Sequence, residues 1–395
     1  MKRSRSRPFP SARVAADNPP MPAFPSLPRT VLAASLLGLA ACAAAPRPTL
    51  VAVESAPPPP VALSVDPALP APAVVAEAWT SPAVEDDELD SLAPWQDRDG
   101  RLWLFATAKR SDKIVVFDAA DGERVRETGG PGTAPGRFAR PNGIAIGGDL
   151  LFVVERDNHR VQVLSLPALE PLGSFGGDQL RVPYGLWVHP ADAGGWEVLV
   201  TDSFMQDFAK GVPPPREQLA ERVKRFRVRV DAGGVHADYA GSFGDTGDGA
   251  LQMVESIAGD AAGRRLMIAE EDHRVGSTLR EYALDGRYRG RSLPPFEGDA
   301  EGVALWECGD GDGYWIAAEQ LRPTRFHLYA RGSLAAAGSF TGQRTALTDG
   351  IALFAAPSAR FPGGALFALD EDRALAAFDL REIARALRLS AHCPR

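Results

Sequence analysis

The sequence predicts an all-β protein, a six-bladed β-propeller with a small helical insertion in the third blade, over residues 84–395. Two observations support this fold, and the first is the recurrence of short β-rich runs from residue 100 onward. Examples are RLWLFATA at 101–108, LLFVVER at 150–156 and WEVLVTD at 196–202. Runs of this length, separated by Gly, Asp, Asn and Pro, are typical of β-strands joined by turns.

The second observation is a longer repeat of these strands. Six groups recur at a spacing of about 35 to 70 residues, and several of them open with Gly and an aliphatic residue, as in NGIAI at 142–146 and DGIAL at 349–353. A single blade cannot bury both of its faces, so such units are expected to close into a ring around a shared axis. The regular repeat favours a propeller over a pair of β-sandwiches.

Two segments interrupt or follow the strands. Residues 205–225 lie inside the third unit, and GVPPPREQLAERVKRF at 211–226 predicts a short helix after the prolines, with Glu217 and Lys224 on its charged face. We expect this insertion to cover one rim. The run LREIARALR at 380–388 predicts a helix that caps the end of the chain.

The N-terminus resembles a targeting signal. Basic residues precede the apolar run VLAASLLGLAA at 31–41, which is too short to span a bilayer as a helix. LAAC at 39–42 resembles the bacterial lipobox, which implies a lipoprotein signal peptide over 1–41 and a lipid on Cys42. An ordinary signal peptide with another cleavage site is the alternative. Residues 42–83, with PPPP at 57–60, predict a Pro/Ala-rich tether.

These features predict a place in the cell envelope, either as a lipid-anchored periplasmic or outer-membrane lipoprotein or as a secreted protein. The lipid would anchor the chain in a membrane, and Cys308 and Cys393 could pair in such an oxidising compartment. The formal net charge of the 395 residues is −8, which argues against nucleic-acid binding and suits the binding of hard cations. We expect a monomer.

Polar residues recur where the predicted strands end. Equivalent strand ends of a propeller meet at one mouth, where crowded carboxylates need cations to neutralise them. Ca²⁺ takes carboxylate oxygens as ligands, and Lys and Arg bind phosphate. The sequence therefore predicts a calcium site for a small phosphorylated substrate. The candidates are Asp90, Lys109, Arg110, Arg156, Tyr184, Glu255, Glu270, Glu271, Asp272, Asp299, Glu301, Asp349 and Asp370.

Simpler roles remain open for several of these residues. Any one carboxylate could be a solvated surface group. Glu270 and Asp272 are better explained as solvated or turn-capping residues than as ligands. Arg110 could pair with Asp112, and Tyr184 could be an ordinary half-buried aromatic residue.

The same residues lie in segments that resemble the β-propeller phytases, calcium-dependent phosphatases that act on inositol hexakisphosphate. The segments occur in the same order as in that family. They are TAKRSDKIVVFDAADG at 107–122, YGLWVHP at 184–190, ESIAGDAAGRRLMIAEED at 255–272, DAEGVALW at 299–306 and TDGIALF at 348–354.

The resemblance implies a 3-phytase-like phosphomonoester hydrolase that uses a metal-activated water. It implies that Lys109, Arg110, Arg156 and Tyr184 bind substrate phosphate and act in catalysis together with Glu271. It also implies a set of calcium ligands, namely Asp90, Glu255, Glu271, Asp299, Glu301, Asp349 and Asp370. The chain departs from the family's pattern at Ser91, near Asn142-Gly143 and at Ser203, where the family has two aspartates and a lysine.

A second resemblance covers one blade. Residues 128–165 resemble an NHL repeat, with RPNGIAI at 140–146 and DNHRVQV at 157–163. NHL propellers are mostly binding platforms, and some of their relatives are lactonases or lyases. The alternatives to a phosphatase are therefore a non-catalytic, envelope-anchored NHL-like platform and a propeller lactonase with one calcium ion.

Overall fold

The fold is taken from a computed structural model that describes residues 71–390 and Cys393. The predicted signal peptide, the lipidation site Cys42 and the tether up to residue 70 lie outside the described residues. Within the described part of the chain, none of the helices combines the length and the apolar character needed to cross a membrane.

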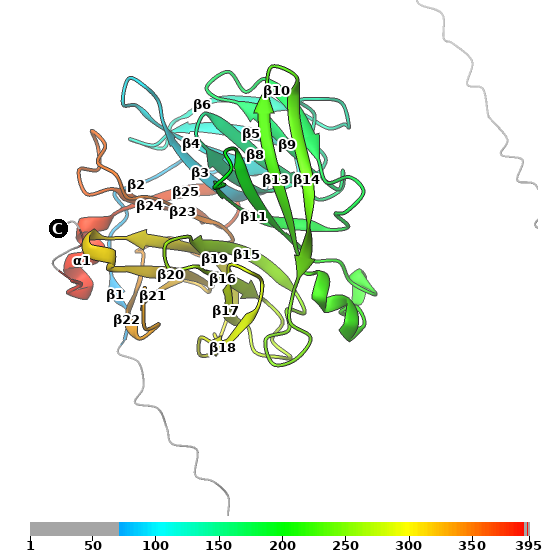
Figure 1. Ribbon diagram of the computed structural model, residues 1–395. Helices are drawn as coiled ribbons and strands as arrows, with labels where there is room; N and C mark the ends of the chain where they lie inside the picture. The colour runs from blue at the N-terminus through cyan, green and yellow to red at the C-terminus, as the bar shows by residue number, and fades with distance from the viewer. Residues whose placement is uncertain (1–70, 391–392, 394–395) are drawn as a thin grey trace, which may run out of the picture. The chain divides into compact units, whose positions relative to one another are not determined.

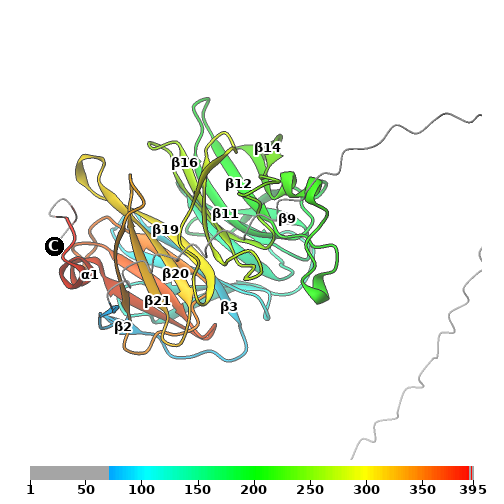
Figure 2. The same cartoon turned by 90° about the horizontal axis from the view of Figure 1, so that it is seen from below.

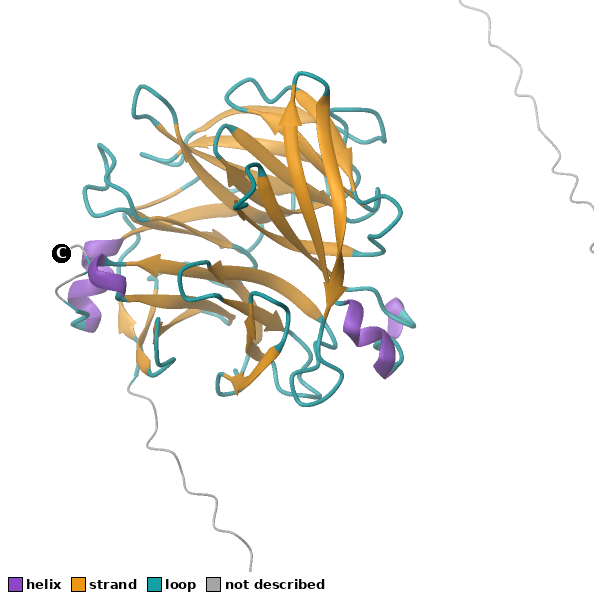
Figure 3. Cartoon of the chain, in the orientation of Figure 1, coloured by secondary structure: helices purple, strands orange, loops and turns teal. Residues whose placement is uncertain are grey.

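Six sheets make up the fold, one for each blade, and each blade is built from consecutive antiparallel strands (Figures 1 and 3). Blade 1 contains β3 (Leu89–Gln96), β4 (Leu102–Ala108), β5 (Lys113–Asp118) and β6 (Arg124–Gly129). Blade 2 contains β7 (Pro141–Gly147), β8 (Leu150–Glu155), β9 (Arg160–Ser165) and β10 (Pro171–Phe175). Blade 3 contains β11 (Pro183–Pro190), β12 (Trp196–Asp202), β13 (Val223–Asp231) and β14 (Gly234–Phe243).

The remaining blades follow the same order. Blade 4 contains β15 (Val254–Asp260), β16 (Arg265–Glu270), β17 (Thr278–Ala283) and β18 (Tyr288–Ser292). Blade 5 contains β19 (Asp299–Glu307), β20 (Gly313–Gln320), β21 (Arg325–Ala330) and β22 (Ala336–Thr341). Blade 6 contains β23 (Ile351–Phe354), β24 (Ala365–Asp370) and β25 (Ala374–Asp379). A 3₁₀ turn, η3 (Gly309–Gly311), joins β19 to β20.

The first strands of the blades line the axis and close a ring. β3 contacts β7, and the contacts continue through β11, β15, β19 and β23 back to β3. Figure 2 shows the green strands β9, β11 and β12 on one side and the yellow to orange strands β19, β20 and β21 on the other. The prediction of an all-β, six-bladed propeller is therefore confirmed.

Two short N-terminal strands complete the ring. β1 (Ala73–Val74) pairs in parallel with β22, and β2 (Trp79–Thr80) becomes the outer strand of blade 6 by pairing with β25. Each covers a strand edge that would otherwise be unpaired. The prediction that the tether reaches residue 83 and that the folded domain starts at residue 84 is wrong, because the chain already joins the sheets at residue 73.

The insertion lies in blade 3, as predicted, between β12 and β13. It forms two 3₁₀ turns, η1 (Phe208–Lys210) and η2 (Arg216–Glu221), rather than one helix that reaches Lys224. The prolines at 213–215 separate the turns. Lys224 lies in β13 with its side chain only 4% exposed, so it does not belong to a solvated helix face.

The C-terminus packs against blade 5. The helix α1 (Leu380–Leu387) begins after Asp379, whose carboxylate accepts a hydrogen bond from the backbone N–H of Arg381. A disulfide joins Cys308, at the end of β19, to Cys393. The predicted helix at this end of the chain is confirmed, and the two cysteines, whose pairing the sequence left open, form a disulfide.

Candidate functional site

Six residues, one at the start of the axis-lining first strand of each blade, lie at the same end of the axis, and we call them the mouth ring. They are Asp90, Asn142, Tyr184, Glu255, Glu301 and Asp349. In blades 1 to 5 the register between the first two strands shifts at this residue, and in blade 6 Asp349 lies just before β23. A bulge of this kind re-aims a side chain, so we expect the irregularity to turn the five residues of blades 1 to 5 toward the opening.

The residue after each member of the mouth ring is Gly or Ser, which lets neighbouring blades come close together. A Cβ atom at Gly143 would lie 2.4 Å from the backbone oxygen of Tyr184, and one at Gly350 would lie 2.4 Å from that of Asp90. The Thr107 hydroxyl donates a hydrogen bond across blades to the Asn142 carbonyl at 2.6 Å. The Gly in the repeated sequence pattern is therefore a close-packing requirement at the mouth.

These small residues also line one end of a cavity of about 400 Å³ that runs between the inner strands. The rest of that cavity is mostly apolar, with Leu92, Ile144 and Val303 among the residues that line it. The titratable groups gather at its mouth. We therefore place the candidate site at the mouth ring and not within the channel.

Lys109 bridges two members of the mouth ring. Its Nζ atom lies 2.8 Å from Asp90 Oδ1 and 3.2 Å from Asp349 Oδ2. Burial opposes the charge on Lys109, but the two carboxylates outweigh it and keep the pKa of the ammonium above its usual value. Burial also raises the pKa of Asp349, to about 7, although Lys109 opposes this shift.

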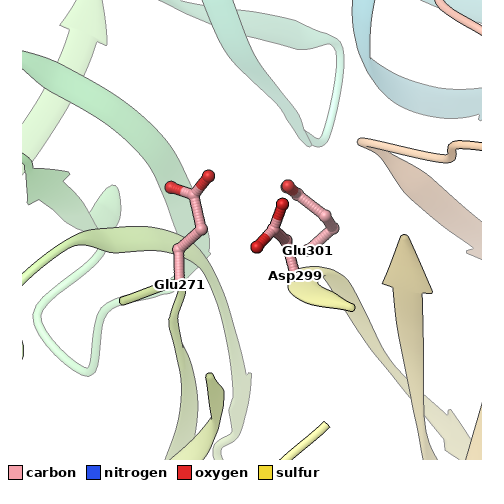
Figure 4. Close-up of side chains that lie close together, drawn as sticks. All are labelled: Glu271, Asp299 and Glu301. Carbon is pink, nitrogen blue, oxygen red and sulfur yellow. The ribbon is translucent and has the colours of Figure 1, made fainter. Parts of the chain in front are cut away.

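Glu271, Asp299 and Glu301 bring their carboxylates together across the gap between blades 4 and 5. One carboxylate oxygen from each lies within 4.8 Å of the others, and Figure 4 shows Glu271 facing the other two. Burial and then Asp299 raise the pKa of Glu271, whereas burial and then Asp349 raise that of Glu301. Burial and then Glu271 raise the pKa of Glu255. Four acids thus share a region where their ionised forms repel one another.

This donor set fits calcium. Ca²⁺ is bound by several carboxylate and amide oxygens, and it removes the repulsion that raises these pKa values. Asn142 strengthens the fit. Its side chain is fully buried, and neither its amide oxygen nor its amide nitrogen has a hydrogen-bond partner among the described residues. Such an orphaned amide is costly unless a cation or a water satisfies it.

Arg156 and Tyr184 lie beside these acids. The guanidinium of Arg156 pairs with Asp157, with Nε 2.7 Å from Oδ1. Burial opposes its charge, but Asp157 and then Tyr184 keep the pKa of Arg156 above its usual value. Burial and then Glu255 raise the pKa of Tyr184, so its hydroxyl stays protonated at neutral pH.

Arg110 lies further out than the other predicted cations. Its side chain is 60% exposed, and its Nε atom lies 3.3 Å from Glu88 Oε2. Glu88 also binds Arg140, with 3.0 Å between Oε1 and Nη2. Arg110 thus pairs with Glu88 and not with Asp112, which was the alternative partner considered from the sequence.

A second set of acids has a structural role. These residues lie at or next to the end of the second strand in blades 2 to 6, and their carboxylates accept hydrogen bonds from backbone N–H groups of the loop that precedes the first strand. They are Glu155, Asp202, Glu270, Glu319 and Asp370. Asp370 accepts from Ala346 N at 2.9 Å, so we assign it this capping role and correct its prediction as a calcium ligand.

Glu270 is a capping residue as expected, but it is fully buried and not solvated. Asp272 pairs with Arg274 at 2.7 Å, so it too is committed to a local contact. Asp372 was not predicted from the sequence, and burial raises its pKa. It follows the strand end by two residues, which is a weak signal in the sequence.

Apolar residues also line the site, and we call them the apolar wall: Met205 and Phe208 from the insertion and Met253 from the loop before β15. A cavity of about 240 Å³ is lined by this apolar wall together with Tyr184, Glu255 and Glu271, and Ser203 and Gly211 complete its lining. These apolar residues were not predicted from the sequence. The insertion at 205–225 was recognised, but nothing in its sequence indicated that it faces the acids.

Comparisons with known proteins support an NHL repeat in this chain but do not assign it an activity. The family model of the NHL repeat matches residues 138–164, which span most of blade 2, so the predicted NHL-like blade is confirmed. No curated protein sequence matches the chain.

Solved structures with similar folds include hydrazine synthase of Kuenenia stuttgartiensis, at 12% identity and a TM-score of 0.42, covering 79% of this chain and 82% of that one. They also include a catalytically inactive virginiamycin B lyase of Staphylococcus aureus with quinupristin, at 10% identity and a TM-score of 0.43, covering 75% of this chain and 97% of that one.

Proposed function

We propose that this propeller is a calcium-dependent phosphomonoester hydrolase of the phytase type. One observation carries the proposal: a single mouth brings together Lys109, Arg156 and Tyr184 with the acids Glu255, Glu271, Asp299, Glu301 and Asp349. Lys109, Arg156 and Tyr184 come from blades 1, 2 and 3, and the acids come from blades 4, 5 and 6. Converging carboxylates with few cations are costly for the fold, so a binding or catalytic role is the simplest reason to keep them.

Calcium would be held by Glu255, Glu271, Asp299, Glu301 and Asp349, with the amide oxygen of Asn142 as a neutral donor. When bound, Ca²⁺ supplies charge neutralisation, polarises a phosphate oxygen and lowers the pKa of a water molecule. The chain's own groups bind and orient the substrate.

Arg156 offers a planar fork of N–H donors to phosphate oxygens, and its pairing with Asp157 fixes the direction of that fork. The protonated hydroxyl of Tyr184 can donate a hydrogen bond to another phosphate oxygen. Lys109 contributes a point charge that is held in place by Asp90 and Asp349. Together they stabilise the negative charge on the phosphoryl group during its transfer to water.

The test is phosphate release from inositol hexakisphosphate, glycerol 1-phosphate and phenyl phosphate by the full chain, with calcium and with excess chelator. We expect activity with calcium on at least one of these esters, its loss with chelator and its recovery when calcium is restored. Glu271→Gln should lower kcat/KM at least about 100-fold, the scale of a lost electrostatic stabiliser.

Glu170→Gln is the matched control, since Glu170 is an exposed glutamate in an outer turn of blade 2. Unchanged phosphate release in excess chelator, or equal effects of the two substitutions, would refute the proposal.

A binding platform is the second candidate, and the NHL repeat at 138–164 favours it. Such a platform would bind its partner without releasing phosphate from any ester. A lactonase with one calcium ion would hydrolyse a lactone and would not need Lys109 and Arg156.

Whichever of these functions the propeller has, we propose that a lipid on Cys42 anchors the chain in the cell envelope.

A further inference from the structure

We infer that the preferred substrate is a phosphate monoester with a small aromatic or apolar alcohol group, which binds against Phe208. The inference rests on the proposed phosphatase function and specifies its substrate class. The cavity of about 240 Å³ is lined both by the acids Glu255 and Glu271 and by the apolar wall. A substrate that fills it must carry both kinds of surface.

Phe208 is the main apolar feature of this wall. Its residue surface is 54% exposed, and it is the one phenylalanine among the strongly exposed large apolar residues of the described chain. An exposed aromatic side chain at the edge of a charged site is typical of a ligand contact. The Arg156 guanidinium lies 5.7 Å from the centre of its ring, so the phosphate-binding group and the apolar wall are neighbours.

The loop that carries Phe208 is held in place. Asp207 caps η1 by accepting from Lys210 N at 3.2 Å and pairs with the Lys210 ammonium at 2.7 Å. Arg274 donates a hydrogen bond to the Gly211 carbonyl at 2.6 Å, which ties the loop to blade 4. The apolar wall is therefore preorganised next to the acids, which lowers the entropic cost of binding.

The charges of the site argue for a single phosphate group. Lys109 is shared by Asp90 and Asp349, and Arg156 is paired with Asp157. Ser203, which lies in the cavity lining where the resembled family has a lysine, adds no charge. A polyphosphorylated ring needs several free cations, and the described residues around this cavity do not supply them.

The size of the cavity agrees with a small ester group. Benzene binds in an engineered apolar cavity of roughly 150 Å³, and drug-sized ligands occupy about 300 Å³ or more. About 240 Å³ suits one aromatic ring or a short branched chain next to the phosphate.

The experiment compares kcat/KM for phenyl phosphate, glycerol 1-phosphate and inositol hexakisphosphate, with calcium present, in the wild type and in Phe208→Ala. We expect the wild type to prefer phenyl phosphate. Phe208→Ala should lower the ratio of kcat/KM for phenyl phosphate to that for glycerol 1-phosphate roughly tenfold, mainly through KM, because an apolar contact is lost. Tyr239→Ala, which truncates an exposed aromatic residue of β14, should leave this ratio unchanged.

Two outcomes overturn the inference while the phosphatase proposal survives. One is a preference for inositol hexakisphosphate, and the other is an equal effect of Phe208→Ala on both small esters. Absence of phosphate release from every ester at every calcium concentration would instead refute the phosphatase function itself.

Discussion

The Nζ atom of Lys109 lies 3.2 Å from Oδ2 of Asp349, although the two residues are 240 positions apart in the sequence. Lys109 directly follows the second strand of blade 1, and Asp349 precedes the first strand of blade 6. This ion pair therefore spans the place where the ring closes. It therefore contributes both to the contact between blades 1 and 6 and to the balance of charges at the mouth.

Replacement of Lys109 by Met should destabilise the fold. The substitution leaves Asp90 and Asp349 buried side by side without their shared cation, which costs about 3 kcal/mol. Urea unfolding in the absence of calcium measures this loss. Lys113→Met removes a more exposed pair with Glu127 and should cost less than about 1 kcal/mol. Equal losses in the two variants would contradict a special role for Lys109.

Calcium should stabilise the protein more at high pH than at low pH. The pKa values of Glu255, Glu301 and Asp349 are raised in the folded chain, that of Asp349 to about 7. The folded state therefore holds more protons than the unfolded state between about pH 4 and 7, and the contribution of these groups to the free energy of unfolding falls as pH rises through that window. Calcium binds the ionised carboxylates and reverses this loss.

Thermal unfolding with calcium and with chelator, at about pH 5 and about pH 8, tests this linkage. We expect the calcium-induced rise in Tm to be larger at the higher pH and to shrink in Asp349→Asn. An equal rise at both pH values would show that calcium does not bind to the groups with raised pKa values.

Gly143→Ala should disturb the mouth through sterics alone. The new methyl group would lie 2.4 Å from the Tyr184 carbonyl oxygen, so blades 2 and 3 must separate at a cost of about 1–3 kcal/mol. We expect lower stability in urea together with reduced phosphate release. Gly177→Ala is the matched control because a methyl group there meets no atom within 4 Å. If both variants behave alike, close packing at Gly143 does not position the mouth ring.

The disulfide should stabilise the C-terminal end. It closes a loop with a sequence separation of 85 residues, and a bond of this kind contributes about 2–4 kcal/mol. The double variant Cys308→Ser/Cys393→Ser should therefore unfold at a lower Tm than the wild type. Reductant should lower the Tm of the wild type to that of the variant and leave the variant unchanged. A wild-type Tm that does not respond to reductant would argue against this contribution.

Much of the fold could be predicted from local patterns. The strands, the six repeats and the Gly that follows the mouth ring are each encoded within a few residues, since turn residues and β-rich runs act locally. The N-terminal strands β1 and β2 could not be predicted in this way. They are two residues long and owe their place to partners at the other end of the chain.

The sequence by itself determined the number of blades and most of the residues that reach the mouth, because strand ends of equivalent blades share one side of the ring. Only the tertiary structure showed what neighbours such as Glu270 and Glu271 contact. Adjacent residues of an extended chain point to opposite sides, so Glu270 caps a buried loop whereas Glu271 faces Asp299 and Glu301. The apolar wall around Phe208 was likewise decided by packing between segments distant in sequence, which no local pattern records.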